Sequence, residues 1–387
     1  MAGIKKYLDK TCVESAYERV RECFNRFDKV AVSFSGGKDS TVVLNIAYDI
    51  AKEYNRLPLE VIFFDEEAIH PTTIDYVKRV AANKDFDFKW YCIPVKHRNA
   101  CSRTQPWWYC WNPEEKDKWI RDLPENAITH LKGFKKGMNV PEAYRLIHKD
   151  YAGTIVSLLG IRADESLRRL RVVTQRNVEN WITMRGKNEG YRAFPIYDFV
   201  TEDVWNITAL KKWDYNKTYD VFKMAGVPPS SQRVCPPYGE EPLRGIQVYA
   251  KCFPAMWHKM LNRVHGVASA WRYSNTDLYS VGLKDPPNGL SWKRYLSLIM
   301  DLYPDDDQIA IKKQVNYLIK YHHSRSKKPI HDSETDLITG CSWKFLCQVV
   351  IKGDFKGRTS NNMADKADKI RERKGMSLSK AQKLFGR

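Results

Sequence analysis

The sequence predicts an α/β protein: a parallel sheet flanked by helices, followed by a helical accessory domain. Strand-like and helix-like segments alternate over the first 240 residues, which is typical of a parallel sheet covered on both faces. After residue 240, apolar residues recur at helical spacing, with Pro-Pro-Asn-Gly at 286–289 as a break. We therefore expect an α/β domain over residues 1–240 and a helical domain over residues 241–387.

The elements of the α/β domain are expected in a regular order. Residues 11–27 have helical spacing, the apolar run at 30–34 is the expected first inner strand, and a helix follows through Ala51. Further strands are expected at LEVIFFDEE, DFKWYCIPV and GTIVSLLGIRADES, and a helix at PTTIDYVKRVAANK, whose Pro71 suits a first turn. Ligands bind beyond the carboxyl ends of parallel strands, so the polar residues that follow these strands can gather at one site.

The stretch VAVSFSGGKDSTVVL, residues 30–44, places glycine, lysine and serine between two apolar runs. Loop amides at a helix N-terminus form an anion site, and glycine lets phosphate oxygens approach the backbone closely. Lys38 adds a positive charge, and Ser35 and Ser40 add hydroxyl donors; an ordinary strand-to-helix turn needs none of these. A Walker A loop is excluded, because valine stands where its first glycine is required and aspartate follows the lysine. Residues 35–40 are therefore predicted to form a phosphate cradle.

The composition limits the classes of function. The chain has 387 residues and a formal net charge of +18, which favours an acidic partner such as nucleic acid or a polyanionic small substrate. Its nine cysteines are scattered and contain no Cys-x-x-Cys pair, so neither a disulfide framework nor a cysteine-ligated metal site is indicated. The N-terminus does not have the pattern of a signal peptide and no apolar run has membrane-spanning length, so we expect a cytoplasmic protein.

Four stretches carry a resemblance to a known family: SFSGGKDS, FFDEEAIHPTTIDYV, LLGIRADESLRR and FPIYDFVTEDVWNI. In order and spacing they are similar to the phosphoadenosine phosphosulfate (PAPS) reductase family, part of the PP-loop ATP pyrophosphatases or adenine nucleotide alpha hydrolases. The resemblance covers residues 25 to about 235 and implies a PP-loop nucleotide-binding domain.

The resemblance also implies which residues hold an adenine nucleotide. Nucleotide-binding residues would be Ser33, Ser35, Gly36, Gly37, Lys38, Asp39, Ser40, Asp65, Gly160, Arg162, Arg168 and Arg169. Lys38, Asp39, Asp65 and Arg162 would be catalytic, and Asp39 and Asp65 would hold or organise Mg²⁺. Asp65 is expected as an exposed carboxylate at a strand end. The cradle would stabilise the departing pyrophosphate by charge, which requires no covalent residue.

The departures from the family pattern disfavour sulfonucleotide reduction. No cysteine follows Cys347, so the C-terminal nucleophile of the reductases is missing, and no paired cysteines are present for an iron–sulfur cluster. Thiolate attack on a sulfonate needs an activated and exposed cysteine. Cys235 is the remaining candidate, and its alternative is a small buried side chain beside two prolines.

A Trp-rich insertion, about residues 97–124, indicates a particular subfamily. The chain resembles the IbrA-type prophage co-activators, which are associated with a ParB-like partner. The aromatic side chains of the insertion could stack on a base or cover the nucleotide, or they could simply pack on the domain. Cys101 and Cys110 could ligate a metal with His97, although their spacing is irregular.

The C-terminal region concentrates positive charge. Residues 351–387 contain eleven Lys or Arg and four Asp or Glu. A solvated basic tail and a nucleic-acid contact are both open interpretations. His322 and His323 have no partners at ligand spacing and stay unassigned.

Two classes of function follow from these observations. The first is an enzyme that binds ATP or a related adenine nucleotide with Mg²⁺, cleaves between the α- and β-phosphates, and transfers the adenylyl group. The second is a regulator that binds nucleotide together with DNA or a ParB-like protein, with little catalysis. A third interpretation, thiolation of a nucleic acid after adenylylation, requires a sulfur-carrying cysteine such as Cys235 or Cys110.

Overall fold

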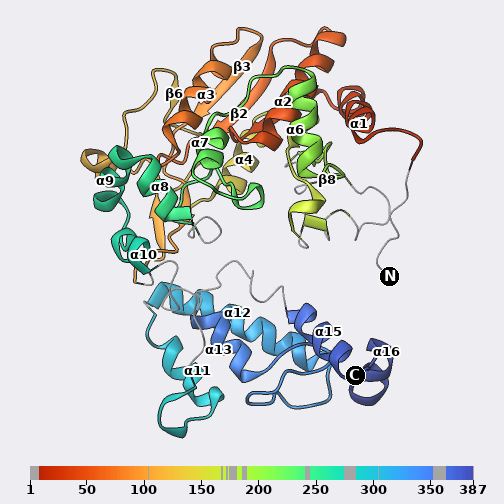
Figure 1. Ribbon diagram of the computed structural model, residues 1–387, viewed down its shortest axis with the longest axis vertical. Coiled ribbons are helices and arrows are strands. Elements are labelled where there is room, and N and C mark those ends of the chain that lie inside the picture. Colours follow the sequence, from red (N-terminus) through yellow and green to blue (C-terminus); the bar gives the residue numbers. More distant parts are fainter. Residues whose placement is uncertain are drawn as a thin grey trace. The chain divides into compact units, whose positions relative to one another are not determined.

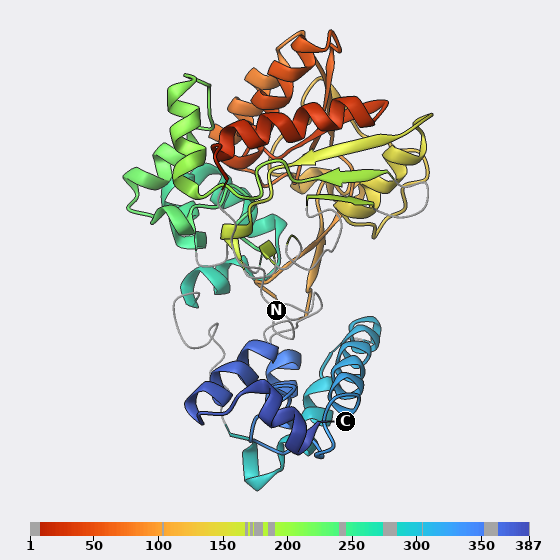
Figure 2. The same cartoon turned by 90° about the vertical axis from the view of Figure 1, so that its right-hand side faces the viewer.

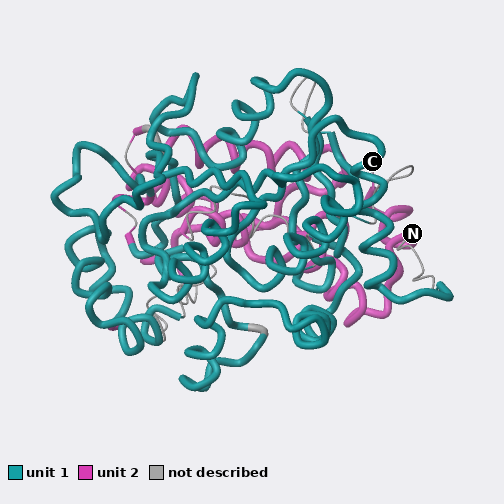
Figure 3. The backbone as a smooth tube through the Cα atoms, turned by 90° about the horizontal axis from the view of Figure 1, so that it is seen from above, with its two compact units in different colours: residues 1–101, 107–271 teal, residues 102–106, 272–387 magenta. Residues whose placement is uncertain are grey.

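The computed structural model describes residues 8–102, 104–166, 169–170, 173, 181–184, 190–239, 245–273, 285–303, 305–351 and 363–386. The chain divides into two compact units (Figure 3). The first unit contains residues 1–101 and 107–271, and the second contains residues 102–106 and 272–387.

A seven-stranded sheet forms the centre of the first unit, as the sequence predicts (Figure 1). In spatial order its strands are β6 (Ala127–Ile128), β3 (Phe86–Tyr91), β2 (Leu59–Phe64), β1 (Lys29–Phe34), β7 (Ile155–Leu159), β9 (Tyr191–Ala193) and β8 (Ile182–Met184). All neighbours are parallel except β8 and β9, which are antiparallel. Every residue of β2 is buried, as expected for a strand covered on both faces. The predicted α/β fold class is confirmed.

The first unit contains the helices α1 (Cys12–Arg26), α2 (Lys38–Glu53), α3 (Pro71–Ala81), α4 (Val140–Lys149), α6 (Thr201–Leu210) and α7 (Thr218–Met224) (Figures 1 and 2). Three of them, α1 to α3, lie where the sequence predicts them, and α4, α6 and α7 were not predicted individually. Local sequence explains several of their N-termini. Thr11 forms a capping box with Glu14, Asn139 forms another with Glu142, and Pro71 occupies the first turn of α3.

The predicted insertion contains a small antiparallel hairpin that the sequence patterns did not indicate. Its strands are β4 (Lys96–Arg98) and β5 (Trp107–Tyr109). Short 3₁₀ turns complete the loops of the two units at Pro113–Lys118, Ala163–Glu165, Pro229–Ser231 and Pro287–Gly289.

The first unit extends further along the chain than the predicted boundary at residue 240. It also includes α8 (Ile246–Cys252), α9 (Pro254–Arg263) and most of α10 (Val267–Tyr273). The guanidinium of Arg263 binds the buried carboxylate of Glu67, with Nε–Oε1 at 2.8 Å and Nη2–Oε2 at 3.0 Å. Asn99 also donates from Nδ2 to the carbonyl of His265, 2.9 Å away. These buried polar contacts join the segment to the sheet domain, so the division falls at residue 271.

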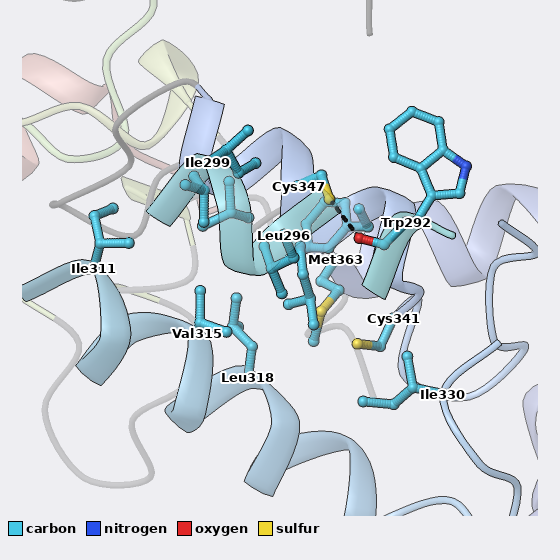
Figure 4. Close-up of a cluster of buried hydrophobic side chains, with 14 residues drawn as sticks. Trp292, Leu296, Ile299, Ile311, Val315, Leu318, Ile330, Cys341, Cys347 and Met363 are labelled. Carbon is cyan, nitrogen blue, oxygen red and sulfur yellow. Dashed lines mark hydrogen bonds between the residues drawn. The ribbon is translucent and has the colours of Figure 1, made fainter. Parts of the chain in front are cut away.

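The second unit is helical, as predicted. Its helices are α11 (Trp292–Met300), α12 (Asp305–His323), α13 (Trp343–Ile351), α15 (Met363–Arg373) and α16 (Leu378–Phe385). A cluster of buried apolar residues joins α11, α12, α13 and the start of α15, and it includes Leu296, Val315 and Met363 (Figure 4). Within the cluster, the thiol of Cys347 donates to the carbonyl of Trp292, 3.2 Å away.

His322 has a structural role in the second unit. It is fully buried at the end of α12. Its Nδ1 lies 2.8 Å from the hydroxyl of Thr339, and its Nε2 lies 2.8 Å from the carbonyl of Lys328. Both ring nitrogens are therefore engaged in the packing of the loop that follows the helix.

Across the ranges given above, no helix has the length and apolar character needed to span a membrane.

Candidate functional site

A cavity of about 330 Å³ opens where β1, β2 and β7 end. Its lining comes from segments far apart in the sequence. The lining residues are Ser33, Phe34, Ser35, Gly37, Lys38, Asp39, Ser40, Phe63, Phe64, Glu66, Ile69, Val140, Tyr144, Leu159, Gly160, Ile161, Glu165, Arg169, Tyr219, Gln232, Arg233, Val234, Cys235 and Pro236. The predicted cradle, residues 35–40, therefore lies at the carboxyl edge of the sheet, where parallel α/β folds bind their ligands.

Hydrogen bonds within the cradle hold its loop against the first turn of α2. The Ser35 amide donates to Ser40 Oγ at 3.2 Å, and the two side-chain hydroxyls lie 3.0 Å apart. Ser40 Oγ in turn donates to the carbonyl of Gly37, 3.0 Å away. The N-cap residue of α2 is Gly37, which has no side chain to cap the helix, and the Lys38 amide donates to the hydroxyl of Tyr219 at 3.0 Å. The other amides of a first helical turn have no acceptor within the helix, which suits an anionic ligand.

Two glycines of the site are required by the backbone. Gly36 has a φ of 71°, and a Cβ added there would lie 3.0 Å from Cγ2 of Thr73. A Cβ at Gly160 would lie 2.6 Å from the carbonyl carbon of Asp39, so β7 can end against α2 only with glycine at this position. Gly37 differs from both, because its φ is −86° and its nearest neighbours would be at 3.4 Å. The apoprotein therefore needs glycine at positions 36 and 160 more strictly than at 37.

Three charged side chains form a chain that starts at the cradle. Lys38 Nζ lies 3.0 Å from Asp39 Oδ2, and Arg162 Nε lies 2.6 Å from Asp39 Oδ1. Burial lowers the pKa of Lys38 below its ordinary value, and the Asp39 carboxylate opposes this shift. Arg162 is 2% exposed and is not among the described residues that line the cavity. It therefore binds Asp39 from the interior of the protein. This corrects the expectation that Arg162 faces the nucleotide.

The other two arginines predicted to bind nucleotide are Arg168 and Arg169. Arg169 lines the cavity and forms an ion pair with Glu165. Arg168 lies outside the described residues. Arg233, which the sequence analysis did not single out, also lines the cavity. The described part of the site thus offers two guanidinium groups in addition to Lys38.

Asp65 does not line the cavity, contrary to its predicted role. It is 1% exposed, and its carboxylate accepts hydrogen bonds from Trp90 Nε1 at 2.7 Å and from the Glu67 amide at 2.9 Å. Arg121 completes this set with an ion pair. Indole and guanidinium donors therefore satisfy the carboxylate within the protein. The neighbouring Glu66 lines the cavity instead, with its Oε1 3.8 Å from Nδ1 of His97.

Comparison with protein families identifies the domain that contains this site. Residues 29–222, from β1 to α7, match the model of the phosphoadenosine phosphosulfate reductase domain. The chain belongs to this family. Residues 226–327 match a second model, a domain of unknown function designated DUF3440.

Two relatives match the chain over different lengths. The uncharacterized protein YbdN of Escherichia coli is 28% identical over 373 residues, covering 92% of this chain and 91% of that protein. The uncharacterized protein MJ0973 of Methanocaldococcus jannaschii is 26% identical over 219 residues, covering 55% of this chain and 44% of that protein.

Solved structures give weaker likenesses. The phosphoadenylyl-sulfate reductase of Candida auris, a phosphate complex, is 15% identical with a TM-score of 0.33, covering 57% of this chain and 94% of that chain. The FMN adenylyltransferase of Candida glabrata, in complex with FAD and pyrophosphate, is 14% identical with a TM-score of 0.35, covering 54% and 58%. At these low scores neither likeness adds to the family assignment.

Within this PAPS reductase domain, the aromatic insertion packs on the sheet. The Trp111 indole donates to the carbonyl of Asp65 at 2.9 Å, and the Trp111 amide donates to Glu67 Oε2 at 2.7 Å. Trp108 and Trp111 are buried, while Trp107 and Trp119 are partly exposed. Of the two interpretations from the sequence, packing on the domain accounts for these contacts.

The cysteines of the insertion are buried thiols. Burial raises the pKa of both Cys101 and Cys110, which disfavours the thiolate that a metal or a nucleophilic role requires. The Cys110 thiol donates to the carbonyl of Ile93 at 3.5 Å. Among the described residues, no group of three His, Cys, Asp or Glu side chains has the arrangement of a metal site.

Cys235 has a different environment from these thiols. It lines the cavity and is partly exposed, whereas a fully buried side chain was the alternative from the sequence. The preceding residue is fixed by His70, whose Nδ1 donates to the carbonyl of Val234 at 3.2 Å. This hydrogen bond holds the cysteine-containing segment against the start of α3.

Three polar residues of the site were missed by the sequence analysis. Asn216 Nδ2 donates to the carbonyl of Gly36 at 2.8 Å, and the hydroxyl of Tyr219 accepts the Lys38 amide at 3.0 Å. Tyr144 donates to the hydroxyl of Ser33 at 2.7 Å. These contacts connect residues more than 100 positions apart, and no local motif predicts such pairs. The weak available signal was the position of Asn216 and Tyr219 shortly after the FPIYDFVTEDVWNI stretch.

Proposed function

We propose that this chain binds ATP or a related adenine nucleotide and cleaves it between the α- and β-phosphates, transferring the adenylyl group to an acceptor. The observation that carries the proposal is the glycine N-cap of α2 at a cavity that is also lined by Lys38, Arg169 and Arg233. Amides and cations directed at one place favour a polyanion. Phe64, Tyr144 and other aromatic or apolar side chains of the same lining suit the adenine ring.

The proposed chemistry is electrostatic. The loop amides and the Lys38 ammonium would stabilise the negative charge that develops on the departing pyrophosphate. Asp39 would keep Lys38 directed toward the phosphates, and Arg162 would fix Asp39 in turn. A phosphate at the cradle would favour the protonated form of Lys38, countering the effect of burial on its pKa.

Magnesium fits this site through Glu66. Mg²⁺ in nucleotide sites is usually held by one or two carboxylates together with phosphate oxygens. Glu66 lines the cavity, whereas both oxygens of Asp39 already face cations. We therefore transfer the proposed metal-binding role from Asp39 and Asp65 to Glu66. The ion, when bound, supplies charge neutralisation of the phosphates.

Cys235 supports a second candidate function. Its place in the lining of the same cavity would allow sulfur transfer to an acceptor that has first been adenylylated. In that case a persulfide donor would pass its outer sulfur to the Cys235 thiolate, and the Cys235 persulfide would attack the adenylylated atom of the acceptor and displace AMP. A second, external thiol would then cleave the resulting disulfide, forming a disulfide with Cys235 and releasing the thiolated acceptor. A ParB-like protein and nucleic acid stay as proposed partners in either case. The net charge of +18 supports the nucleic acid.

The test is incubation of the full chain with Mg²⁺ and ATP labelled at the α-phosphate, with and without DNA. Release of AMP or a labelled acceptor, together with pyrophosphate, is the expected result. Lys38→Ala should lower nucleotide affinity or turnover by roughly ten- to a hundred-fold, the effect of one charge-assisted hydrogen bond. Lys52→Ala, at an exposed position on the same helix, is the control and should change neither.

Three other outcomes of this experiment would contradict parts of the proposal. Nucleotide binding without cleavage under all conditions would favour the regulator over the enzyme. No sulfur in the acceptor after reaction with the parent protein, or sulfur transfer that continues undiminished in Cys235→Ala, would remove the second candidate. If Lys38→Ala binds nucleotide as the parent protein does, the cradle is not the phosphate site.

A further inference from the structure

A second cavity, of about 870 Å³, lies within the first unit beside the one described above. It is formed by α6, by the loop that leads to α7, by α7 itself and by the turn that follows it (Figure 1). Tyr219 and Gln232 line both cavities, so the two share a wall. The volume is within the range of about 300–1,000 Å³ that is usual for small-molecule sites.

Aromatic rings dominate the inner surface of this second cavity. Trp205, Trp213, Tyr215 and Tyr219 all line it. Trp205 meets Tyr215 and Tyr219 edge to face, at centroid distances of 5.5 and 5.2 Å and interplanar angles of 84° and 83°. Rings fixed in this way by their neighbours form a rigid surface, against which a planar ring can stack at little entropic cost.

The charge of the lining favours an anionic group on that ring. Lys212 and Lys223 are exposed, and neither forms an ion pair with any residue that the structure describes. The carboxylate of Asp220 is already engaged: it accepts the Tyr215 hydroxyl at 3.0 Å and lies 3.9 Å from Lys217 Nζ. Glu202 is the other acid of the lining, so the lining contains two lysines without an ion pair and one further carboxylate among the described residues.

The shared wall connects this second cavity to the phosphate cradle. The ring of Tyr219 lies against Trp205, while its hydroxyl accepts the Lys38 amide. Burial raises the pKa of Tyr219, so the hydroxyl stays protonated. Asn216, in the loop between α6 and α7, donates to the carbonyl of Gly36. The segment that forms the aromatic surface is thus bonded directly to the cradle.

We propose that this second cavity binds a nucleobase that carries a phosphate, either as a free nucleotide or as part of single-stranded nucleic acid. The base stacks on Trp205 or Trp213, as bases do on aromatic side chains regardless of sequence. Lys212 and Lys223 contact the phosphate by charge-assisted hydrogen bonds. The site is separate from the nucleotide site proposed above and does not depend on the cleavage reaction.

The test is calorimetric titration of the full chain with thymidine 5′-monophosphate and, separately, with a ten-nucleotide oligo(dT). Trp213→Ala should weaken binding of the probes about five- to a hundred-fold, which is the range for removal of a base-stacking ring. The double variant Lys212→Ala/Lys223→Ala, at two exposed positions, should weaken binding and reduce its dependence on salt. Lys211→Ala, the neighbouring lysine outside the lining, is the matched control and should bind as the parent protein does.

The two sources of the base are distinguished by the pair of probes. Tighter binding of oligo(dT), strengthened at low salt, identifies a nucleic-acid strand; equal binding of the two probes identifies a free nucleotide. The proposal is overturned if neither probe binds at millimolar concentration, or if both variants bind them as tightly as the parent protein. It is also overturned if Lys38→Ala abolishes binding of the probes and Trp213→Ala does not, because the probes would then occupy the cradle.

Discussion

The ends of β1 and β2 show how similar sequences at one edge of a sheet lead to different roles. Both strands are apolar and both are followed within five residues by carboxylates. After β1, Asp39 lines the cavity. After β2, Asp65 and Glu67 are almost completely buried and Glu66 alone of the three acids reaches the cavity.

The difference lies in the donors that surround each carboxylate. The Asp65 carboxylate is bound by the Trp90 indole of β3 and by Arg121, and the Glu67 carboxylate is bound by the Trp111 amide of the insertion and by Arg263. Asp39 is paired with Lys38 of the cradle and with Arg162, which follows β7, and it still lines the cavity. A carboxylate at the end of a parallel strand is therefore a candidate ligand only where the fold leaves it without internal donors. Four measurements test this explanation of the difference between the two strand ends.

The largest effect is expected from Arg263→Ala. The Arg263 and Glu67 side chains are 1% and 0% exposed, so the substitution leaves a buried carboxylate without its partner. Such losses cost about 3–5 kcal/mol of unfolding free energy. Denaturant titration followed by tryptophan fluorescence measures this. Glu115→Gln, which removes the more exposed partner of the same arginine, should cost less than about 1 kcal/mol. Equal losses of unfolding free energy in the two variants would show that the buried Arg263–Glu67 pair contributes no more stability than the exposed Arg263–Glu115 pair.

The next effect concerns pH and His70, which follows the acidic end of β2. Burial lowers the pKa of His70 from 6.5 to about 4. Between these values the unfolded chain takes up a proton that the folded chain does not, so stability should fall as pH falls from 6.5 to 4. The loss at pH 4 is on the order of 3 kcal/mol.

The measurement is a series of denaturant titrations across this pH range. His70→Gln should flatten the curve between pH 6.5 and 4, because the group that titrates is removed. His258→Gln, at an exposed position on α9, should leave the curve as it is in the parent protein. A curve equally steep in His70→Gln would assign the loss to other groups.

The third effect compares two glycines at the β1 side of the site. Gly160→Ala should cost about 2–3 kcal/mol, because the new methyl group would overlap the backbone of Asp39. Gly37→Ala should leave the melting temperature nearly unchanged, because that position has ordinary backbone angles and room for a methyl group. If Gly37→Ala nevertheless abolishes nucleotide binding, phosphate approaches the backbone at that residue. Similar melting temperatures for both variants would contradict the close approach at Gly160.

The smallest effect separates Asp65 from Glu66. Asp65→Asn removes one acceptor from a buried set of donors and should cost about 1–3 kcal/mol of stability. Glu66→Gln should leave stability within about 0.5 kcal/mol and should instead weaken the Mg²⁺ dependence of nucleotide binding. Thermal melting and nucleotide titration at varied Mg²⁺ measure the two effects. A stable Asp65→Asn protein that has lost its Mg²⁺ dependence would restore the role expected from the sequence.

The strands and helices whose signals lie within a few neighbouring residues could be predicted from the sequence alone. The apolar runs predicted β1, β2, β3 and β7, helical spacing predicted α1, and Pro71 marked the start of α3. The cradle was also predictable, because glycine, lysine and serine in one short loop carry a local physical meaning. These features depend on backbone geometry and on periodicity, both of which are visible within a few residues.

Which side chains face the cavity depends on the tertiary structure. The choice of Glu66 over Asp65 depends on Trp90 and Arg121, and the position of Tyr219 on the cradle depends on a helix 181 residues away in sequence. The boundary at residue 271 depends in the same way on the buried pair of Arg263 and Glu67. Hydrogen-bond donors satisfy an acid only when the fold brings them within about 3 Å of it, and no pattern along the chain encodes that distance.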